Sequence, residues 1–156
     1  TGFEVIKGLS TLEEGAAVIF TRDTHFKDSY MDSNEGKHLP VEHCIYQTHG
    51  WSVHEDVDVI GAYHINKPRF GKTDIGLDIY DYVKQIDDNA EVEEIEICGF
   101  CTDICVISNA LIIKGTKELE DANVIVDAKA CAGVTPETHE AALKVMEMCQ
   151  IEVRRD

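Results

Sequence analysis

The chain has 156 residues, of which 44% are hydrophobic and 28% are charged. This is the composition of a soluble globular protein, and it excludes a disordered or fibrous chain. The formal net charge of −16 argues against nucleic acid and membrane surfaces as partners, because clustered Lys and Arg drive binding to both. No apolar run approaches the roughly 20 residues of a membrane-spanning helix, and residues 1–10 do not resemble a signal peptide. We therefore expect a cytoplasmic protein, and a small neutral ligand is compatible with its charge.

Strand-length apolar runs alternate with helical patterns along the chain, which indicates an α/β fold with a mostly parallel sheet. The predicted strands cover 16–20, 57–65, 93–100, 123–128 and 150–153, and the predicted helices cover 74–86, 103–115 and 136–148. We expect one domain over residues 1–156. A short helical segment (5–15) runs straight into the first strand, so we expect an N-terminally incomplete domain whose opening strand is missing.

The polar segment 24–56 is too long for an ordinary connection, and loops of that length are usually functional or disordered. Asp23 lies just before this segment and His25 lies at its start, both soon after a predicted strand. His43 lies further along the segment. Residues two apart in an extended chain project to the same side, so Asp23 and His25 could share one ion with His43. These donors suit zinc, iron or manganese. The alternative is that they are surface histidines in an acidic loop.

Lys67 ends a predicted strand just before Pro68, and ligands of open α/β sheets bind at the carboxyl ends of strands. An ammonium there could stabilise a thiolate. The alternative is a solvated surface lysine.

Of the six cysteines, Cys105 is the candidate nucleophile. It falls in the first turn of the helix predicted at 103–115, where the partial positive charge lowers a thiol pKa. We expect Thr102 or Asp103 to cap this helix. Two alternatives remain: an inert buried thiol, or a redox pair with Cys101. Because nothing suggests secretion, we expect reduced thiols, with three acting as packed apolar residues: Cys98, Cys131 and Cys149.

Four segments together resemble the isochorismatase-like cysteine hydrolases, in particular their nicotinamidase and pyrazinamidase branch. GFCTDICV (99–106) resembles the GxxTDxCV motif of the family. TRDTHF (21–26) and EHC (42–44) resemble the TRDxH and HC signatures of nicotinamidases, and KPRFG (67–71) resembles the KPxFG stretch. The likeness covers nearly the whole chain and implies a three-layer α/β/α fold.

The resemblance also implies roles for particular residues. Cys105 would be the nucleophile and Lys67 the catalytic lysine, with a cis Phe100–Cys101 bond and the amides of Cys101 and Cys105 forming an oxyanion hole. Asp23, His25 and His43 would hold a divalent metal, zinc first, that receives the substrate's ring nitrogen. Ser29 stands where many relatives have another histidine, so Glu35 is the expected fourth ligand and His38 the fallback.

The implied reaction is cysteine-dependent hydrolysis of a small carboxamide, nicotinamide first, in a homo-oligomer. Three aromatic residues are candidates to stack on the substrate ring, with ordinary core packing as the alternative for each: Phe26, Trp51 and Phe70. The family's general-base aspartate belongs to a DxQ segment that this sequence does not contain. An isochorismatase-type enzyme, another amidase of the family, and a non-catalytic family member therefore stay open as alternatives.

Overall fold

The computed structural model describes residues 16–54, 56–57 and 61–155. The described residues fall into two compact units, which we call the N-terminal unit (16–70) and the C-terminal unit (71–155). Each unit is described by itself. The helical segment predicted at 5–15 lies outside the described residues, as does part of the strand predicted at 57–65.

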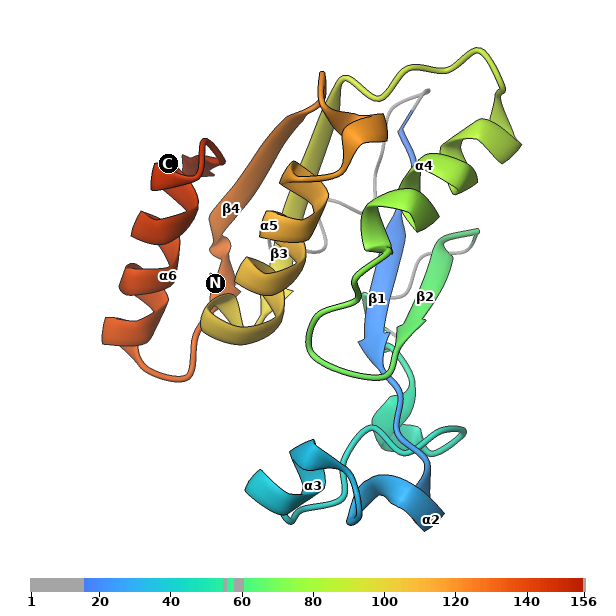
Figure 1. Cartoon of the computed structure of the whole chain (residues 1–156), viewed down its shortest axis with the longest axis vertical. Helices are drawn as coiled ribbons and strands as arrows, with labels where there is room; N and C mark the ends of the chain where they lie inside the picture. The colour runs from blue at the N-terminus through green and yellow to red at the C-terminus, as the bar shows by residue number, and fades with distance from the viewer. Residues whose placement is uncertain (1–15, 55, 58–60, 156) are drawn as a thin grey trace. The chain divides into compact units, whose positions relative to one another are not determined.

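The N-terminal unit contains two parallel strands, β1 (Ile19–Asp23) and β2 (Tyr63–Lys67), which pair from Ile19↔Tyr63 to Asp23↔Lys67. Both strands therefore end at the same edge (Figure 1). Each runs further than the sequence predicted, since β1 takes in the polar residues after Phe20 and β2 reaches Lys67. The start predicted for the second strand, at residue 57, was wrong as well, because residues 56, 57 and 61 form turns.

The predicted long loop is partly helical. It contains α2 (Lys27–Tyr30), α3 (Asn34–His38) and the short 3₁₀ helix η1 (His49–Trp51), and Figure 1 shows α2 and α3 beyond the carboxyl end of β1. Tyr30 is almost fully buried. A Cβ on Gly36 would lie 2.1 Å from the Tyr30 carbonyl oxygen, so only glycine allows α3 to pack this closely against the end of α2.

The C-terminal unit contains a three-stranded parallel sheet in the order β3-β4-β5. Its helices α5 and α6 flank β3 and β4 in Figure 1. The core of the unit centres on the β4 side chains and the inner face of α6, where Val124, Ile125, Val126, Leu143 and Met146 are fully buried. The elements are α4 (Ile75–Ile86), β3 (Glu94–Phe100), the π-helical turn η2 (Thr102–Val106), α5 (Ile107–Lys114), η3 (Lys117–Leu119), β4 (Asn123–Ala132), α6 (Pro136–Met148) and β5 (Glu152–Arg154).

The predicted α/β class with parallel strands is confirmed. The three-layer arrangement and the single domain over 1–156 stay predictions. Two local predictions were wrong: the helix predicted at 103–115 begins as a π-helical turn without a side-chain cap, and Cys149 is exposed because it follows the last turn of α6.

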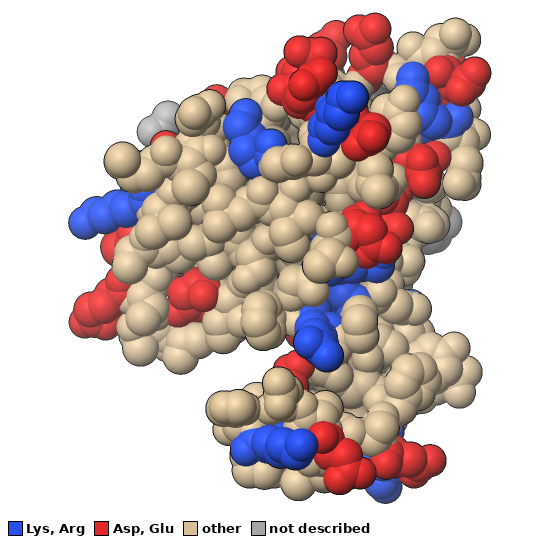
Figure 2. Space-filling model, in the orientation of Figure 1, with Lys and Arg blue, Asp and Glu red and all other residues tan. Residues whose placement is uncertain are grey.

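The outer surface agrees with the low content of basic residues. On the face shown in Figure 2, Lys and Arg lie singly or in small groups among Asp and Glu. No helix among the described residues is long and apolar enough to cross a membrane.

Candidate active site

The backbone after β1 brings two histidines together. The His25 amide donates to the Cys44 carbonyl (3.0 Å), and the Tyr46 amide donates to the His25 carbonyl (2.8 Å). This parallel bridge between His25 and Ile45 places the imidazoles of His25 and His43 with their ring centroids 4.9 Å apart. The buried His25 ring and the half-buried His43 ring thus face one location.

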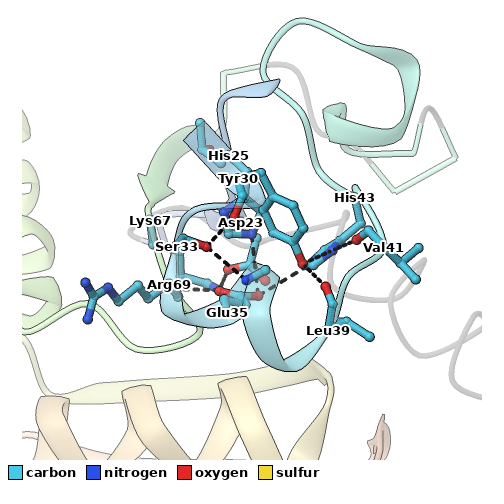
Figure 3. A network of polar contacts seen from close by, with 12 residues as sticks. Asp23, His25, Tyr30, Ser33, Glu35, Leu39, Val41, His43, Lys67 and Arg69 are labelled. Carbon is cyan, nitrogen blue, oxygen red and sulfur yellow. Dashed lines mark hydrogen bonds and ion pairs between the residues drawn. The ribbon is translucent and has the colours of Figure 1, made fainter. Parts of the chain in front are cut away.

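Glu35 of α3 completes a group of three possible metal ligands (Figure 3). Ser33 caps α3 by accepting from the Gly36 amide at 2.9 Å. Glu35 Oε1 lies 3.5 Å from His25 Nε2 and 3.3 Å from His43 Nε2, and the three ligand atoms lie within 4.8 Å of one another. Three of the four predicted ligands therefore converge.

Hydrogen bonds around Tyr30 determine which nitrogen of His43 carries its proton. The Tyr30 hydroxyl donates to the Leu39 carbonyl (2.7 Å), so it can only accept at the 3.2 Å contact with His43 Nδ1. Nδ1 also faces the Val41 carbonyl at 2.9 Å, which is an acceptor. Nδ1 therefore carries the proton, and a neutral His43 presents the lone pair of Nε2 to Glu35.

The group fits a divalent cation. His25 Nε2 is buried and has no hydrogen-bond partner among the described residues, which is costly for a polar atom. Two imidazole nitrogens facing one carboxylate oxygen need protons or a cation between them. A metal ion would accept all three donors, and two histidines with one carboxylate suit zinc or iron while leaving positions open for another ligand.

Asp23 and Lys67 form an ion pair at the ends of β1 and β2. The Lys67 ammonium donates to Asp23 Oδ1, and it lies 3.5 Å from the Arg69 carbonyl. Lys67 is only 2% exposed, which removes the alternative of a solvated surface lysine. The metal-ligand group contains Glu35 and not Asp23, so a ligand role for Asp23 stays a prediction.

Aromatic side chains surround this part of the N-terminal unit. Trp51 donates its indole N–H to Thr24 Oγ1 at 2.9 Å, and the Arg22 guanidinium lies 3.5 Å from the Trp51 ring centroid. Tyr46 packs edge-on against Trp51 and contacts Phe26. Phe26 and Phe70 are 60% and 50% exposed, so core packing does not explain them. Their role in substrate binding stays a prediction.

The fallback ligand His38 does not join the metal group. Its Nδ1 lies 2.8 Å from the Asn34 carbonyl, and its side chain is exposed.

In the C-terminal unit, Cys105 lies within η2 and follows a cis Phe100–Cys101 peptide bond. The Cys101 carbonyl accepts from the amides of Ile104 (3.1 Å) and Val106 (3.0 Å). The bond from Val106 spans five residues, which makes a wider turn than an α-helix, and such turns often occur at functional sites. Asn109, buried in α5, donates to the Cys105 carbonyl at 2.7 Å.

The other cysteines of the β3–β4 region are poor nucleophile candidates. Burial raises the pKa of Cys98 to about 11 and that of Cys131 to about 12, so both stay protonated near neutral pH. The predicted meeting of Cys105 with Lys67 and the metal ligands stays a prediction, since the two units are described separately.

Sequence reasoning missed two supporting residues, Tyr30 and Asn109. Tyr30 stands in the polar segment KDSYMDS without an apolar periodicity, so only the fold reveals its burial. Asn109 interrupts the apolar pattern of the helix predicted at 103–115, and a buried polar residue in such a pattern is a signal that could have found it.

Comparisons with known proteins identify the family of the chain. The family model described as "Isochorismatase domain" matches residues 9–155. No curated protein sequence matches the chain.

Solved structures with the same fold include a nicotinamidase/pyrazinamidase from Bacillus subtilis, with 23% identity, a TM-score of 0.77, and coverage of 99% of this chain and 84% of that one. A pyrazinamidase of Pyrococcus horikoshii in complex with zinc has 23% identity and a TM-score of 0.69, covering 98% and 82% of the two chains. An isochorismatase family protein from Desulfovibrio vulgaris has 22% identity and a TM-score of 0.77, covering 97% and 78%.

The family model covers most of the chain, and the structural neighbours share its fold. The protein is therefore a member of the isochorismatase family of hydrolases.

Proposed function

We propose that this protein hydrolyses a small aromatic carboxamide, with nicotinamide as the first substrate to test, by a cysteine-dependent mechanism. The observation that carries the proposal is the group of His25, Glu35 and His43, in which a buried imidazole nitrogen has no hydrogen-bond partner among the described residues. Support also comes from the nicotinamidases and pyrazinamidases among the structures with the same fold.

The three ligands, with Asp23 as the fourth, would hold a divalent cation, zinc as in the Pyrococcus protein. Iron and manganese accept the same donors. When bound, the cation supplies a Lewis-acidic position that can receive a ring nitrogen. Phe26, Trp51 and Phe70 would contact the faces of the ring, because aromatic side chains stack readily on aromatic ligands.

Cys105 is the proposed nucleophile. Its thiolate attacks the carboxamide carbon, the carbonyl electrons move to oxygen, and the amides of Cys101 and Cys105 would stabilise that oxyanion. The carbonyl then re-forms and the C–N bond breaks while the leaving nitrogen takes a proton from water, so that ammonia departs and a thioester on Cys105 remains. Water cleaves the thioester to the carboxylate and restores the thiolate. The Lys67 ammonium would stabilise the negative charge on sulfur.

The test is a nicotinamide hydrolysis assay with ammonia detection on the full chain. The proposal predicts turnover that Cys105→Ala abolishes and that Cys149→Ala leaves unchanged, since Cys149 is exposed at the end of α6. Turnover that survives Cys105→Ala would exclude Cys105 as the nucleophile. An oligomeric, cytoplasmic enzyme stays part of this proposal.

A further inference from the structure

We propose that Asp103 is a positioning residue that holds the η2 turn, and with it Cys105, against the start of α6. This inference rests on the proposed function, because it concerns the nucleophile assigned there. It arises from hydrogen bonds that the predicted helix-capping role of Asp103 does not explain, since Asp103 accepts them from the β4–α6 connection and from α6 itself.

The Asp103 carboxylate accepts hydrogen bonds from the segment that leads into α6. The Val134 amide donates to Oδ1 at 3.1 Å and to Oδ2 at 2.9 Å, and the Thr138 hydroxyl donates to Oδ2. Hydrogen bonds to an ionised acceptor are the stronger kind. Consistently, the bond from Thr138 and that from Val134 lower the pKa of Asp103, so the carboxylate is charged at neutral pH.

The neighbouring residue makes a second contact with the same helix. Thr102 is fully buried, and its hydroxyl lies 2.8 Å from Nδ1 of His139. A Cβ on Gly133 would lie 2.8 Å from the His139 Cβ and 3.1 Å from Asp103 Oδ2. The β4–α6 connection therefore approaches the turn as closely as a glycine permits, and two consecutive side chains fasten the turn to α6.

The turn is also held on its other side. Asn109 donates to the Cys105 carbonyl at 2.7 Å, and its own Oδ1 accepts from the Lys72 amide at 3.1 Å. Cys105 thus lies two residues after Asp103 and four residues before Asn109, and both of these side chains are held by hydrogen bonds. A π-helical turn is less regular than an α-helix, and we infer that the Asp103 contacts keep this turn from relaxing to α-helical spacing, which would move the thiol.

Variants at Thr138 isolate this role from the charge of Asp103. Thr138→Val removes the donated hydrogen bond, whereas Thr138→Ser keeps a hydroxyl. Because Thr138 also belongs to the capping box of α6 with Thr135, Thr135→Val is the matched control, which weakens the cap but leaves the Asp103–Thr138 contact in place. Circular dichroism confirms that each variant is folded.

For nicotinamide hydrolysis, we expect Thr138→Val to lower kcat about 10- to 100-fold, because a displacement of about 1 Å at a reacting group can cost about 100-fold. KM should change less than about twofold, since the residues proposed to bind the ring are elsewhere in the chain. Thr138→Ser should retain most of the kcat of the native protein, and Thr135→Val should match it. Asp103→Asn should behave like Thr138→Val.

A second readout does not depend on turnover: the rate at which iodoacetamide alkylates Cys105, followed by mass spectrometry with Cys149 as internal reference. We expect slower alkylation of Cys105 in Thr138→Val and in Asp103→Asn. If Asp103 acted through its charge alone, Asp103→Asn would instead speed alkylation, because loss of a nearby negative charge favours the thiolate.

The inference is overturned if Thr138→Val matches Thr135→Val in both kcat and alkylation of Cys105. Turnover that survives Cys105→Ala defeats the proposed function instead, and the alkylation rates then still decide whether Asp103 and Thr138 position the thiol. If Asp103→Asn does not fold, the comparison of valine with serine at position 138 decides the question.

Discussion

Replacing Glu35 with glutamine tests the metal centre. The change keeps the shape of the side chain but removes the carboxylate that lies 3.3–3.5 Å from the Nε2 atoms of His25 and His43. Loss of a residue that merely orients a metal ligand already costs 10- to 100-fold in affinity. Loss of a direct ligand should therefore weaken metal binding by about 100-fold or more.

This loss of affinity has a thermal consequence that can be calculated. A metal concentration of 100 times Kd stabilises the folded state by about 2.7 kcal/mol. At the same concentration a variant with about 100-fold weaker affinity keeps only about 0.4 kcal/mol of this stabilisation. Because about 1 kcal/mol corresponds to roughly 2–4 °C in Tm at this chain length, the metal-induced rise in Tm should be roughly 5–9 °C smaller in Glu35→Gln. Without metal, the variant should be as stable as the native protein, since a glutamine amide can donate to the lone pair that His43 presents.

The assay is a chelator-competition titration with zinc, combined with thermal unfolding with and without the metal. Glu42→Gln is the matched control, because Glu42 precedes His43, is exposed and lies outside the ligand group. Native zinc affinity in Glu35→Gln would refute the assignment of Glu35 as a ligand.

Three further predictions concern other parts of the chain. Asp23→Asn should lower the free energy of unfolding by about 3 kcal/mol in a urea titration, because it removes a negative partner of the buried Lys67 ammonium; an unchanged midpoint would contradict this. Asp103→Asn should lower the Tm at pH 7, and the difference should shrink as the pH falls below about 4 and vanish only below the lowered pKa of the folded state, because a carboxyl whose pKa folding lowers contributes its full stability above the unfolded pKa and loses it as the pH falls through the folded pKa. At pH 8, Cys98 and Cys131 should resist iodoacetamide in the folded protein, since burial raises the pKa of each thiol to about 11 and about 12; rapid modification of either would show that it is accessible as a thiolate.

The sequence predicted most successfully the elements whose side-chain pattern reflects burial. The helices predicted at 74–86 and 136–148 match α4 and α6 to within one residue, because each has an apolar face at helical spacing. The N-terminal strands were placed less well. Their carboxyl ends carry polar residues, Asp23 and Lys67 among them. A hydrophobic pattern cannot predict the part of a strand that carries such side chains.

Local structure made by specific hydrogen bonds was harder to predict. Helices α2 and α3 have four and five residues, too few to show a periodicity, so the polar segment indicated a loop. The capping role predicted for Thr102 and Asp103 assumed a regular α-helix after β3. Their side chains instead bind Thr138 and His139 of α6, a tertiary contact that spacing within the chain cannot reveal.

For the site, the structure brings together three of the predicted ligands, His25, Glu35 and His43, and their role as metal ligands stays a prediction; Glu35 came from the family resemblance and an absent histidine at position 29. The ligands lie just after β1, on α3 and in the segment after α3, so their meeting depends on the His25–Ile45 bridge and on the close packing at Gly36. Neither feature has a sequence signature apart from the glycine itself.

If a thiol and a metal centre together hydrolyse an aromatic amide, turnover should depend on both. The most direct measurement is ammonia release from nicotinamide by the zinc-loaded full chain, compared with its Cys105→Ala and Glu35→Gln variants. We expect turnover in the native protein, none in Cys105→Ala, and turnover in Glu35→Gln that falls in proportion to its zinc occupancy. Suppose instead that both variants turn over nicotinamide at the native rate, either with zinc fully bound or after zinc is removed. That result would contradict the proposed roles of the thiol and the metal.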